Sequence, residues 1–155
     1  MSSVILPGSY DPVTLGHLEL IRKATKLYDE VYAVVFINPD KQYTFSLQER
    51  VEMLKLATED LKGVTVDCSE GLVIDYMRER GIEKIIKGYR DSRDLEYERR
   101  QAEYNFEHGG YETELWEADF AMQNISSTKA RELIKGGADA SEILPKKVIS
   151  YINNH

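Results

Sequence analysis

His17 and the turn before it form the part of the chain best suited to chemistry. A short apolar run, Val4 to Leu6, is followed by a turn rich in Pro, Gly, Ser and Asp, and then by Thr14-Leu15-Gly16-His17 at a helix start. The first turn of a helix carries unpaired backbone N–H groups and a partial positive charge, which together favour a phosphate. The pattern therefore predicts a nucleotide site that includes His17.

The glycines do not form either of the common phosphate loops. None of the ten glycines builds G-x-G-x-x-G, and no G-x-x-x-x-G-K-[ST] occurs. Phosphate binding must therefore use another arrangement of backbone and side chains.

Five ordered segments resemble those of the HxGH-type nucleotidyltransferases, in the branch of the phosphopantetheine adenylyltransferases. The first is Pro7 to His17, with threonine at position 14 in place of the first histidine of the motif. The others are Asn38 to Lys41, Phe45 to Val51, Asp94 to Glu98 and Ile125 to Thr128. The resemblance implies transfer of the adenylyl group of ATP to 4′-phosphopantetheine, by in-line attack and without a covalent intermediate, as in coenzyme A biosynthesis.

The resemblance also implies a role for each matching residue. His17 is expected to stabilise charge on the α-phosphate, Lys41 to neutralise the attacking phosphate and Arg90 to bind the nucleotide phosphates, and these three are the expected catalytic residues. The expected substrate-binding residues are Ser9, Lys41, Val73 and Lys87. The expected ATP-binding residues are Ser9, Tyr10, His17, Gly88, Tyr89, Arg90, Glu98, Met122, Gln123, Asn124, Ile125, Ser126, Ser127 and Thr128.

The segment Lys87-Gly88-Tyr89-Arg90 departs from the family, which usually has Arg-Gly-Leu-Arg. Lys87 keeps the positive charge expected at the acceptor phosphate but loses the bidentate geometry of arginine. Asp91-Ser92-Arg93 also replaces a small apolar stretch. These changes leave open an altered acceptor or an altered assembly.

Length and composition suit one globular domain over residues 1–155, with 42% hydrophobic residues. The net charge of −7 argues against a general partner of nucleic acids or membrane surfaces. An anionic ligand must therefore be bound by a local group of basic residues. The family resemblance brings towards the nucleotide two segments that carry the basic residues Lys87, Arg90, Arg93, Arg99, Arg100, Lys129 and Arg131.

The single cysteine, Cys68, excludes intramolecular disulfides and favours a reducing compartment. No apolar run approaches the ~20 residues of a membrane span, so a cytoplasmic protein is expected. No Cys and His cluster supports a structural zinc site. The family's ATP chemistry implies Mg²⁺, for which no ligand residue is assigned, and the family resemblance implies a homohexamer in which part of Glu96 to His108 faces another subunit.

Strand patterns alternate with helical ones, which predicts a doubly wound α/β domain with a parallel, Rossmann-like sheet. Strands are expected at 4–6, 31–36, 64–67, 85–86 and 113–118, and 64–68 is interpreted as a buried strand. Helices are expected to begin after Ser46, capped with Glu49, and at Ser126 or Ser127. The apolar face of the first helix is predicted to comprise Leu18, Leu20, Ile21, Ala24 and Leu27.

Two other functions remain open. Ile125 to Arg131 resembles the second motif of nicotinate and nicotinamide mononucleotide adenylyltransferases, whereas Thr14 and the helix entry at Phe45-Ser46-Leu47 count against that substrate. A non-catalytic nucleotide-binding module is the third hypothesis. The presence of Ser9, His17, Lys41 and Arg90 argues against it.

Overall fold

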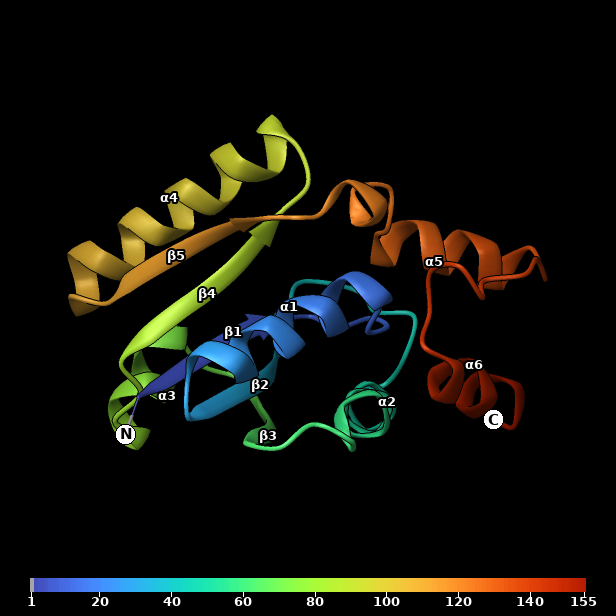
Figure 1. Ribbon diagram of the computed structural model, residues 1–155, viewed down its shortest axis with the longest axis horizontal. Helices are drawn as coiled ribbons and strands as arrows, with labels where there is room; N and C mark the ends of the chain where they lie inside the picture. The colour runs from blue at the N-terminus through green and yellow to red at the C-terminus, as the bar shows by residue number, and fades with distance from the viewer. Residues whose placement is uncertain (1) are drawn as a thin grey trace.

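The computed structural model describes residues 2–155 and is built around a parallel sheet (Figure 1). Its five strands run in the order β3-β2-β1-β4-β5. They are β1 (Ser3–Gly8), β2 (Glu30–Phe36), β3 (Val64–Ser69), β4 (Lys84–Tyr89) and β5 (Glu112–Glu117). The order changes direction between β1 and β4, which is where ligands bind in sheets of this kind. The predicted doubly wound α/β fold is confirmed.

The helices between the strands begin at well-defined caps. The predicted capping box is present: Ser46 accepts a hydrogen bond from the N–H of Glu49, and the Glu49 carboxylate accepts one from the N–H of Ser46. Ser126 caps the fifth helix by accepting from the N–H of Lys129. The helices are α1 (Leu15–Leu27), α2 (Leu47–Thr58), α3 (Val73–Arg80), α4 (Ser92–Gly109), α5 (Ser127–Lys135) and α6 (Lys146–Asn153), with a 3-10 turn at Phe120–Met122.

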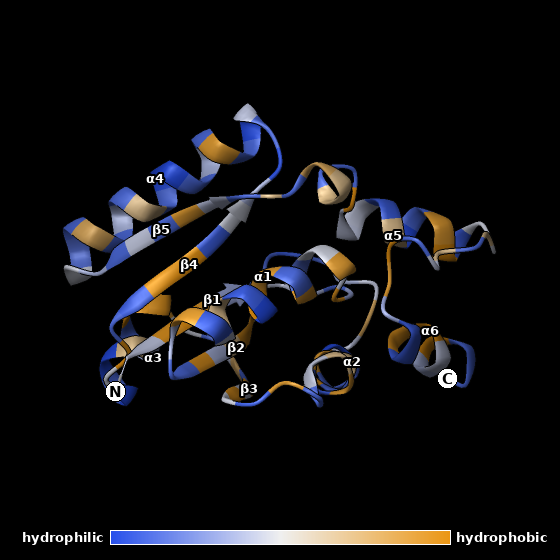
Figure 2. Cartoon of the chain, in the orientation of Figure 1, coloured by the Kyte–Doolittle hydropathy of each residue, from blue (hydrophilic) through white to orange (hydrophobic). Residues whose placement is uncertain are grey.

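Alternate residues of the central strands enter two separate apolar clusters. Val4 and Leu6 pack on one side of β1, in the cluster that includes residues of α1 and α2, whereas Ile5 packs on the other side with Met77 of α3. Because both faces are covered, the middle of β1 and most of β2 are continuous apolar runs, Val4 to Leu6 and Val31 to Phe36. Strand β4 is apolar at Ile85 and Ile86, between Lys84 and Lys87. Figure 2 accordingly shows apolar colouring over only part of β4, whereas α4 is largely hydrophilic.

Two details of the predicted core are wrong. Leu27 is 66% exposed, because α1 ends there and the chain turns toward β2. Cys68 is exposed rather than buried, since β3 lies at the edge of the sheet, beside β2. Among residues 2–155, no helix is both long and apolar enough to cross a membrane.

Candidate active site

A cavity of about 520 Å³ lies where the strand order changes direction. Its walls come from the ends of β1 and β4, the start of α1, and the segments that follow β2 and β5. Loops that are far apart in the sequence therefore meet at one place, as expected at the carboxyl edge of a parallel sheet. The predicted site residues that line it are Ser9, Tyr10, His17, Lys41, Lys87, Gly88, Tyr89, Arg90, Glu98, Met122, Ile125, Ser126, Ser127 and Thr128.

Three predicted site residues do not line this cavity. Val73 begins α3 and packs against the apolar cluster of Ile5 and Met77 on the other side of the sheet. Gln123 instead donates a hydrogen bond to the carbonyl oxygen of Ala118, and Asn124 is exposed.

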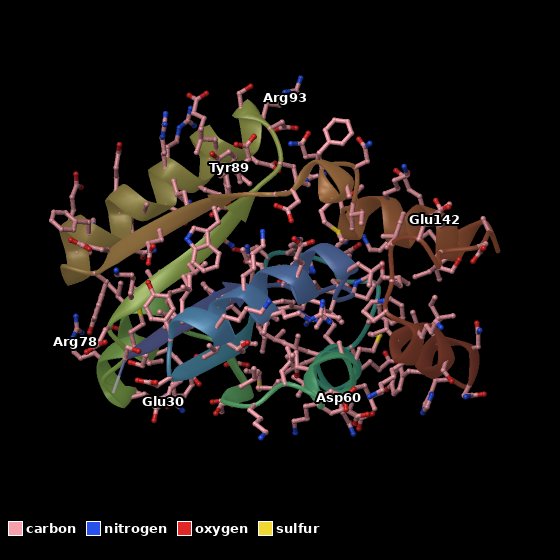
Figure 3. All side chains as sticks on the ribbon, viewed as in Figure 1. Glu30, Asp60, Arg78, Tyr89, Arg93 and Glu142 are labelled. Atoms are coloured by element: carbon pink, nitrogen blue, oxygen red, sulfur yellow. The ribbon has the colours of Figure 1, made fainter. Side chains whose placement is uncertain are left out.

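The basic residues of the two predicted segments divide between the cavity and the exposed surface. Lys87, Arg90 and Arg131 line the cavity, and Lys41 joins them from the β2–α2 loop. Arg93 projects outward from the start of α4, as Figure 3 shows. The other four basic residues of these segments are exposed and lie outside the cavity lining: Arg93, Arg99, Arg100 and Lys129.

The His17 ring is fixed by the residue that caps its own helix. The N–H of Thr14 donates to Nδ1 of His17 at 3.0 Å, while the N–H of His17 donates to Oγ1 of Thr14 at 3.3 Å. A backbone N–H can only donate, so Nδ1 is an acceptor and a neutral ring carries its proton on Nε2. Burial, assisted by the positive charges of Lys87 and Arg90, lowers the pKa of His17 to about 4. The free protein at neutral pH therefore presents an Nε2–H donor.

Tyr10 supports that ring from the β1–α1 loop. Its ring centroid lies 4.9 Å from that of His17, and its hydroxyl donates to the carbonyl oxygen of Leu6 at 2.7 Å. Burial raises the pKa of the Tyr10 phenol, so the hydroxyl stays protonated. Tyr10 adopts a φ of 47°, a left-handed conformation that is strained for a residue other than glycine.

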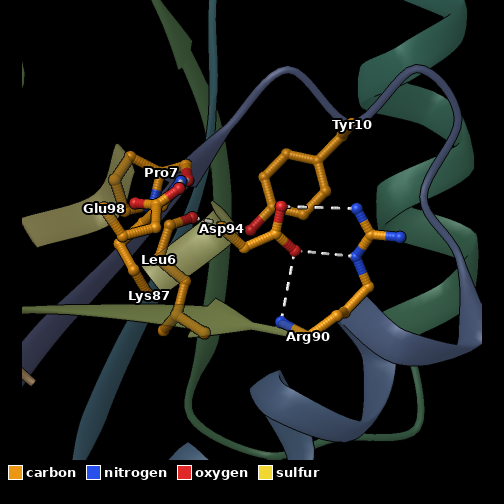
Figure 4. Close-up of polar contacts among 7 residues, drawn as sticks. All are labelled: Leu6, Pro7, Tyr10, Lys87, Arg90, Asp94 and Glu98. Atoms are coloured by element: carbon orange, nitrogen blue, oxygen red, sulfur yellow. Dashed lines mark hydrogen bonds and ion pairs between the residues drawn. The ribbon is translucent and has the colours of Figure 1, made fainter. Parts of the chain in front are cut away.

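The second wall pairs each of its cations with a carboxylate of α4 (Figure 4). Arg90 donates through Nε to Asp94 at 2.9 Å, and the backbone N–H of Arg90 donates to the same oxygen at 3.2 Å. Lys87 donates through Nζ to the carbonyl oxygen of Pro7 at 3.1 Å and lies 3.7 Å from Oε1 of Glu98. Both cations are thus held in place before any phosphate binds.

Glu98 is the most unusual side chain on this wall. It is 9% exposed, and its Oε2 is buried without a hydrogen-bond partner among the described residues. Burial raises the pKa of Glu98, with Lys87 opposing that effect. Because an unpaired buried carboxylate oxygen is costly, this oxygen is available to a donor on a ligand.

The start of α5 faces the same cavity, but its hydroxyls are already bonded within the protein. Ser127 donates through Oγ to the carbonyl oxygen of Pro12 at 2.9 Å, and Thr128 accepts from Arg131 at 3.1 Å. Arg131 also donates to the carbonyl oxygen of Asp11 at 2.9 Å. Ser127 and Arg131 therefore tie the helix to the β1–α1 loop, leaving its first N–H groups as the donors for an anion.

Two residues that support the site, Asp94 and Arg50, lie in segments that match the family but were given no role from the sequence. Asp94 lies four residues after Arg90, and that acid–base spacing was the available signal. Arg50 lies three residues after Leu47 and four before Leu54, on the apolar side of α2, where a charged residue is unexpected. It is 2% exposed.

The chain is similar to known nucleotidyl-transferring proteins over most of its length. The model of the family described as cytidylyltransferase-like matches residues 5–133. The chain is 38% identical over 155 residues to a protein of Clostridium novyi (strain NT) named phosphopantetheine adenylyltransferase. That alignment covers 99% of this chain and 96% of the relative. The similarity thus extends over nearly the full length of both proteins.

Proposed function

Since the chain belongs to the cytidylyltransferase-like family, and within it to the phosphopantetheine adenylyltransferases, we propose that it transfers the adenylyl group of ATP to 4′-phosphopantetheine. An oxygen of the acceptor phosphate attacks the α-phosphorus of ATP as the bond from that phosphorus to the bridging oxygen of pyrophosphate breaks. The products are dephospho-coenzyme A and pyrophosphate. The observation that carries the proposal is a neutral His17 donor in one cavity with Lys41, Lys87 and Arg90.

His17 suits the developing charge in this reaction. Its Nε2–H is fixed by the bond that Nδ1 accepts from Thr14, so the ring needs little reorganisation when charge spreads over the α-phosphate. Lys87 and Lys41 neutralise the attacking phosphate, and Arg90 with the first N–H groups of α5 binds the leaving phosphates. In this mechanism the protein aligns the two substrates and neutralises their phosphate charge, and no covalent intermediate is required.

The same proposal includes Mg²⁺ bound with ATP. Among residues 2–155, no group of three or more His, Cys, Asp and Glu side chains converges as a ready-made metal site. The arrangement fits an ion that is carried mainly by nucleotide phosphates and water, with a carboxylate such as Asp119 or Glu19 in reach of the cavity. When bound, the metal would supply Lewis-acid neutralisation of phosphate charge.

We further propose that the enzyme works in the cytoplasm as a homohexamer. The single cysteine supports the first part, and the exposed aromatic residues of α4, Tyr97, Tyr104 and Phe106, support an interface there. Light scattering at micromolar concentration should give six times the 17.8 kDa chain mass. A monomer under those conditions would refute the assembly.

The decisive experiment pairs ATP and Mg²⁺ with alternative acceptors. Pyrophosphate should be released with 4′-phosphopantetheine and not without an acceptor. Faster turnover with nicotinate mononucleotide would replace the proposed acceptor. Nucleotide binding without any pyrophosphate release would instead favour a non-catalytic module.

A further inference from the structure

Arg50 is a buried cation that the proposed chemistry leaves unused. It is 2% exposed, it does not line the cavity, and among residues 2–155 no ion pair joins it to a carboxylate. Nε donates to the carbonyl oxygen of Phe45 at 3.2 Å and Nη1 donates to that of Ser9 at 3.1 Å. Burying an arginine without a carboxylate partner is costly. A hydrophobic side chain would avoid that cost but could not donate hydrogen bonds to these two carbonyl groups, so we ask what the two bonds hold in place.

The bond from Arg50 to Ser9 holds the peptide next to the strained residue of the site. The Ser9 carbonyl belongs to the peptide that joins Ser9 to Tyr10, whose φ is 47°. Such a conformation persists where surrounding contacts impose it. Asp11 supplies the other restraint, because its carboxylate accepts hydrogen bonds from the N–H groups of Thr44 and Phe45, each at 2.9 Å.

The same guanidinium also orders the loop that carries Lys41. Cζ of Arg50 lies 3.8 Å from the centroid of the Tyr43 ring, and Nζ of Lys41 lies 5.5 Å from that centroid. The Tyr43 hydroxyl accepts a hydrogen bond from the N–H of Asn38 at 2.9 Å, which closes the loop onto itself. Arg50 therefore touches both the backbone that presents Ser9 and the aromatic ring beneath Lys41.

We propose that Arg50 is a positioning residue that fixes Ser9 and Lys41 toward the acceptor phosphate without contacting that phosphate. This inference rests on the proposed adenylyl transfer to phosphopantetheine. Its consequence is that the geometry of the guanidinium, and not its charge alone, determines acceptor affinity. Lysine at this position keeps the charge but cannot donate in a fixed fork to two carbonyl groups.

The main test is Arg50→Lys, with acceptor and ATP kinetics measured separately. Loss of one charge-assisted hydrogen bond corresponds to about a tenfold fall or more, so we expect kcat/KM for 4′-phosphopantetheine to fall about ten- to a hundredfold. The rise should be larger for KM of the acceptor, to which both Ser9 and Lys41 are assigned, than for KM of ATP, to which only Ser9 of the two is assigned. Trp116 is the only tryptophan and lines the cavity, so its fluorescence reports acceptor binding without turnover.

Two control variants separate positioning from stability. Arg78→Lys makes the same substitution at an exposed arginine of α3, and it should leave both KM values unchanged. Leu54→Val lies one turn from Arg50 on α2 and lowers stability through the core, so it should lower Tm without raising KM for the acceptor.

A third comparison tests whether Arg50 acts through the two residues. In a Ser9→Ala, Lys41→Ala background, adding Arg50→Lys should change phosphopantetheine affinity less than about twofold, since the groups that Arg50 positions are gone. A full tenfold effect in that background overturns the proposal, as does an unchanged acceptor KM for Arg50→Lys alone. Failure of the proposed function is distinguishable, because the wild-type protein itself would then neither bind phosphopantetheine nor release pyrophosphate with it.

Discussion

The β4–α4 wall of the cavity differs from the loops after β1 and β2 in how its cations are held. On the wall, Lys87 and Arg90 each lie beside a carboxylate of α4, at 3.7 and 2.9 Å. In the loops, Lys41 lies over the ring of Tyr43. Arg50, in the first turn of α2 and outside the cavity lining, donates to one carbonyl oxygen of each loop. An incoming phosphate must compete with a carboxylate on the wall, whereas in the loops it meets Lys41, which forms no ion pair with a carboxylate among residues 2–155.

This difference separates two means of preparing an anion site. Carboxylates hold cations in place but reduce the positive potential that a ligand experiences. Hydrogen bonds that a cation donates to carbonyl oxygens, and contact with a π face, hold it without that loss, although burying a cation without a carboxylate partner costs stability. His17 meets both regions, since Thr14 fixes its ring and the two cations of the wall help to lower its pKa.

The largest expected effect comes from removing the group that both regions support. His17→Ala should lower kcat by at least ~10²-fold, about 2.7 kcal/mol, which is the cost of losing one preorganised donor to the transition state. Single-turnover pyrophosphate release measures this step directly. A folded variant with near-normal turnover would show that His17 only caps α1, as the partner of Thr14 in the capping box.

Lys87→Ala tests the paired wall. A charged hydrogen bond to phosphate contributes ~1.5–3 kcal/mol, so kcat/KM for the acceptor should fall roughly ten- to a hundredfold, with little change in ATP affinity. Lys87→Arg should remain active because it keeps the charge. Unchanged acceptor kinetics in the alanine variant would mean that Lys87 serves Glu98 and the Pro7 carbonyl only.

Much of the fold and of the site followed from local patterns. Ser46 with Glu49 and Ser126 predicted helix starts because capping depends on neighbouring residues, and His17 stood out by its place after the β1 turn. The prediction for Cys68 was wrong because the exposure of a strand depends on whether it lies in the centre or at the edge of the sheet, and the residues of the strand alone do not determine that position.

The supporting partners were harder to predict than the reactive residues. Arg50 bonds to Ser9 across 41 positions of the chain, and Lys87 bonds to Pro7 across 80, so neither pair shares a local pattern. Val73 followed the family's motif, yet α3 places it on the other side of the sheet from the cavity. Such contacts are set by topology, which becomes visible only when the strands are ordered.

The pH dependence of stability tests how strongly the two regions enclose His17. Its pKa is about 4 in the fold against 6.5 as an ordinary value, so the unfolded chain binds the proton more readily between these values. Stability due to this group is present above pH 6.5 and is lost as pH falls toward 4. Between pH 7 and 5 we expect a loss of at most about 2 kcal/mol.

Urea unfolding of wild type and His17→Asn at both pH values isolates that contribution. The raised pKa of Glu98 has the opposite effect on stability, because the folded protein binds that proton more readily than the unfolded chain and gains stability as pH falls. Glu98 is present in both proteins, so its contribution cancels when wild type and His17→Asn are compared. Equal losses in the two proteins would show that the ring is not enclosed as strongly as the fold indicates.

The smallest expected effect bears most directly on the difference between the two regions. Asp94→Asn keeps an oxygen that can accept from Arg90 but removes the negative charge beside it. The pair is 38% and 31% exposed, so its own contribution is modest, whereas the added positive potential acts on every phosphate of ATP. We therefore expect KM for ATP to fall about two- to fivefold. The control is Glu96→Gln, which removes a negative charge from an exposed ion pair with Arg100 on the same helix and should leave KM for ATP unchanged. A higher KM for Asp94→Asn would show that the carboxylate positions Arg90 more than it competes for it.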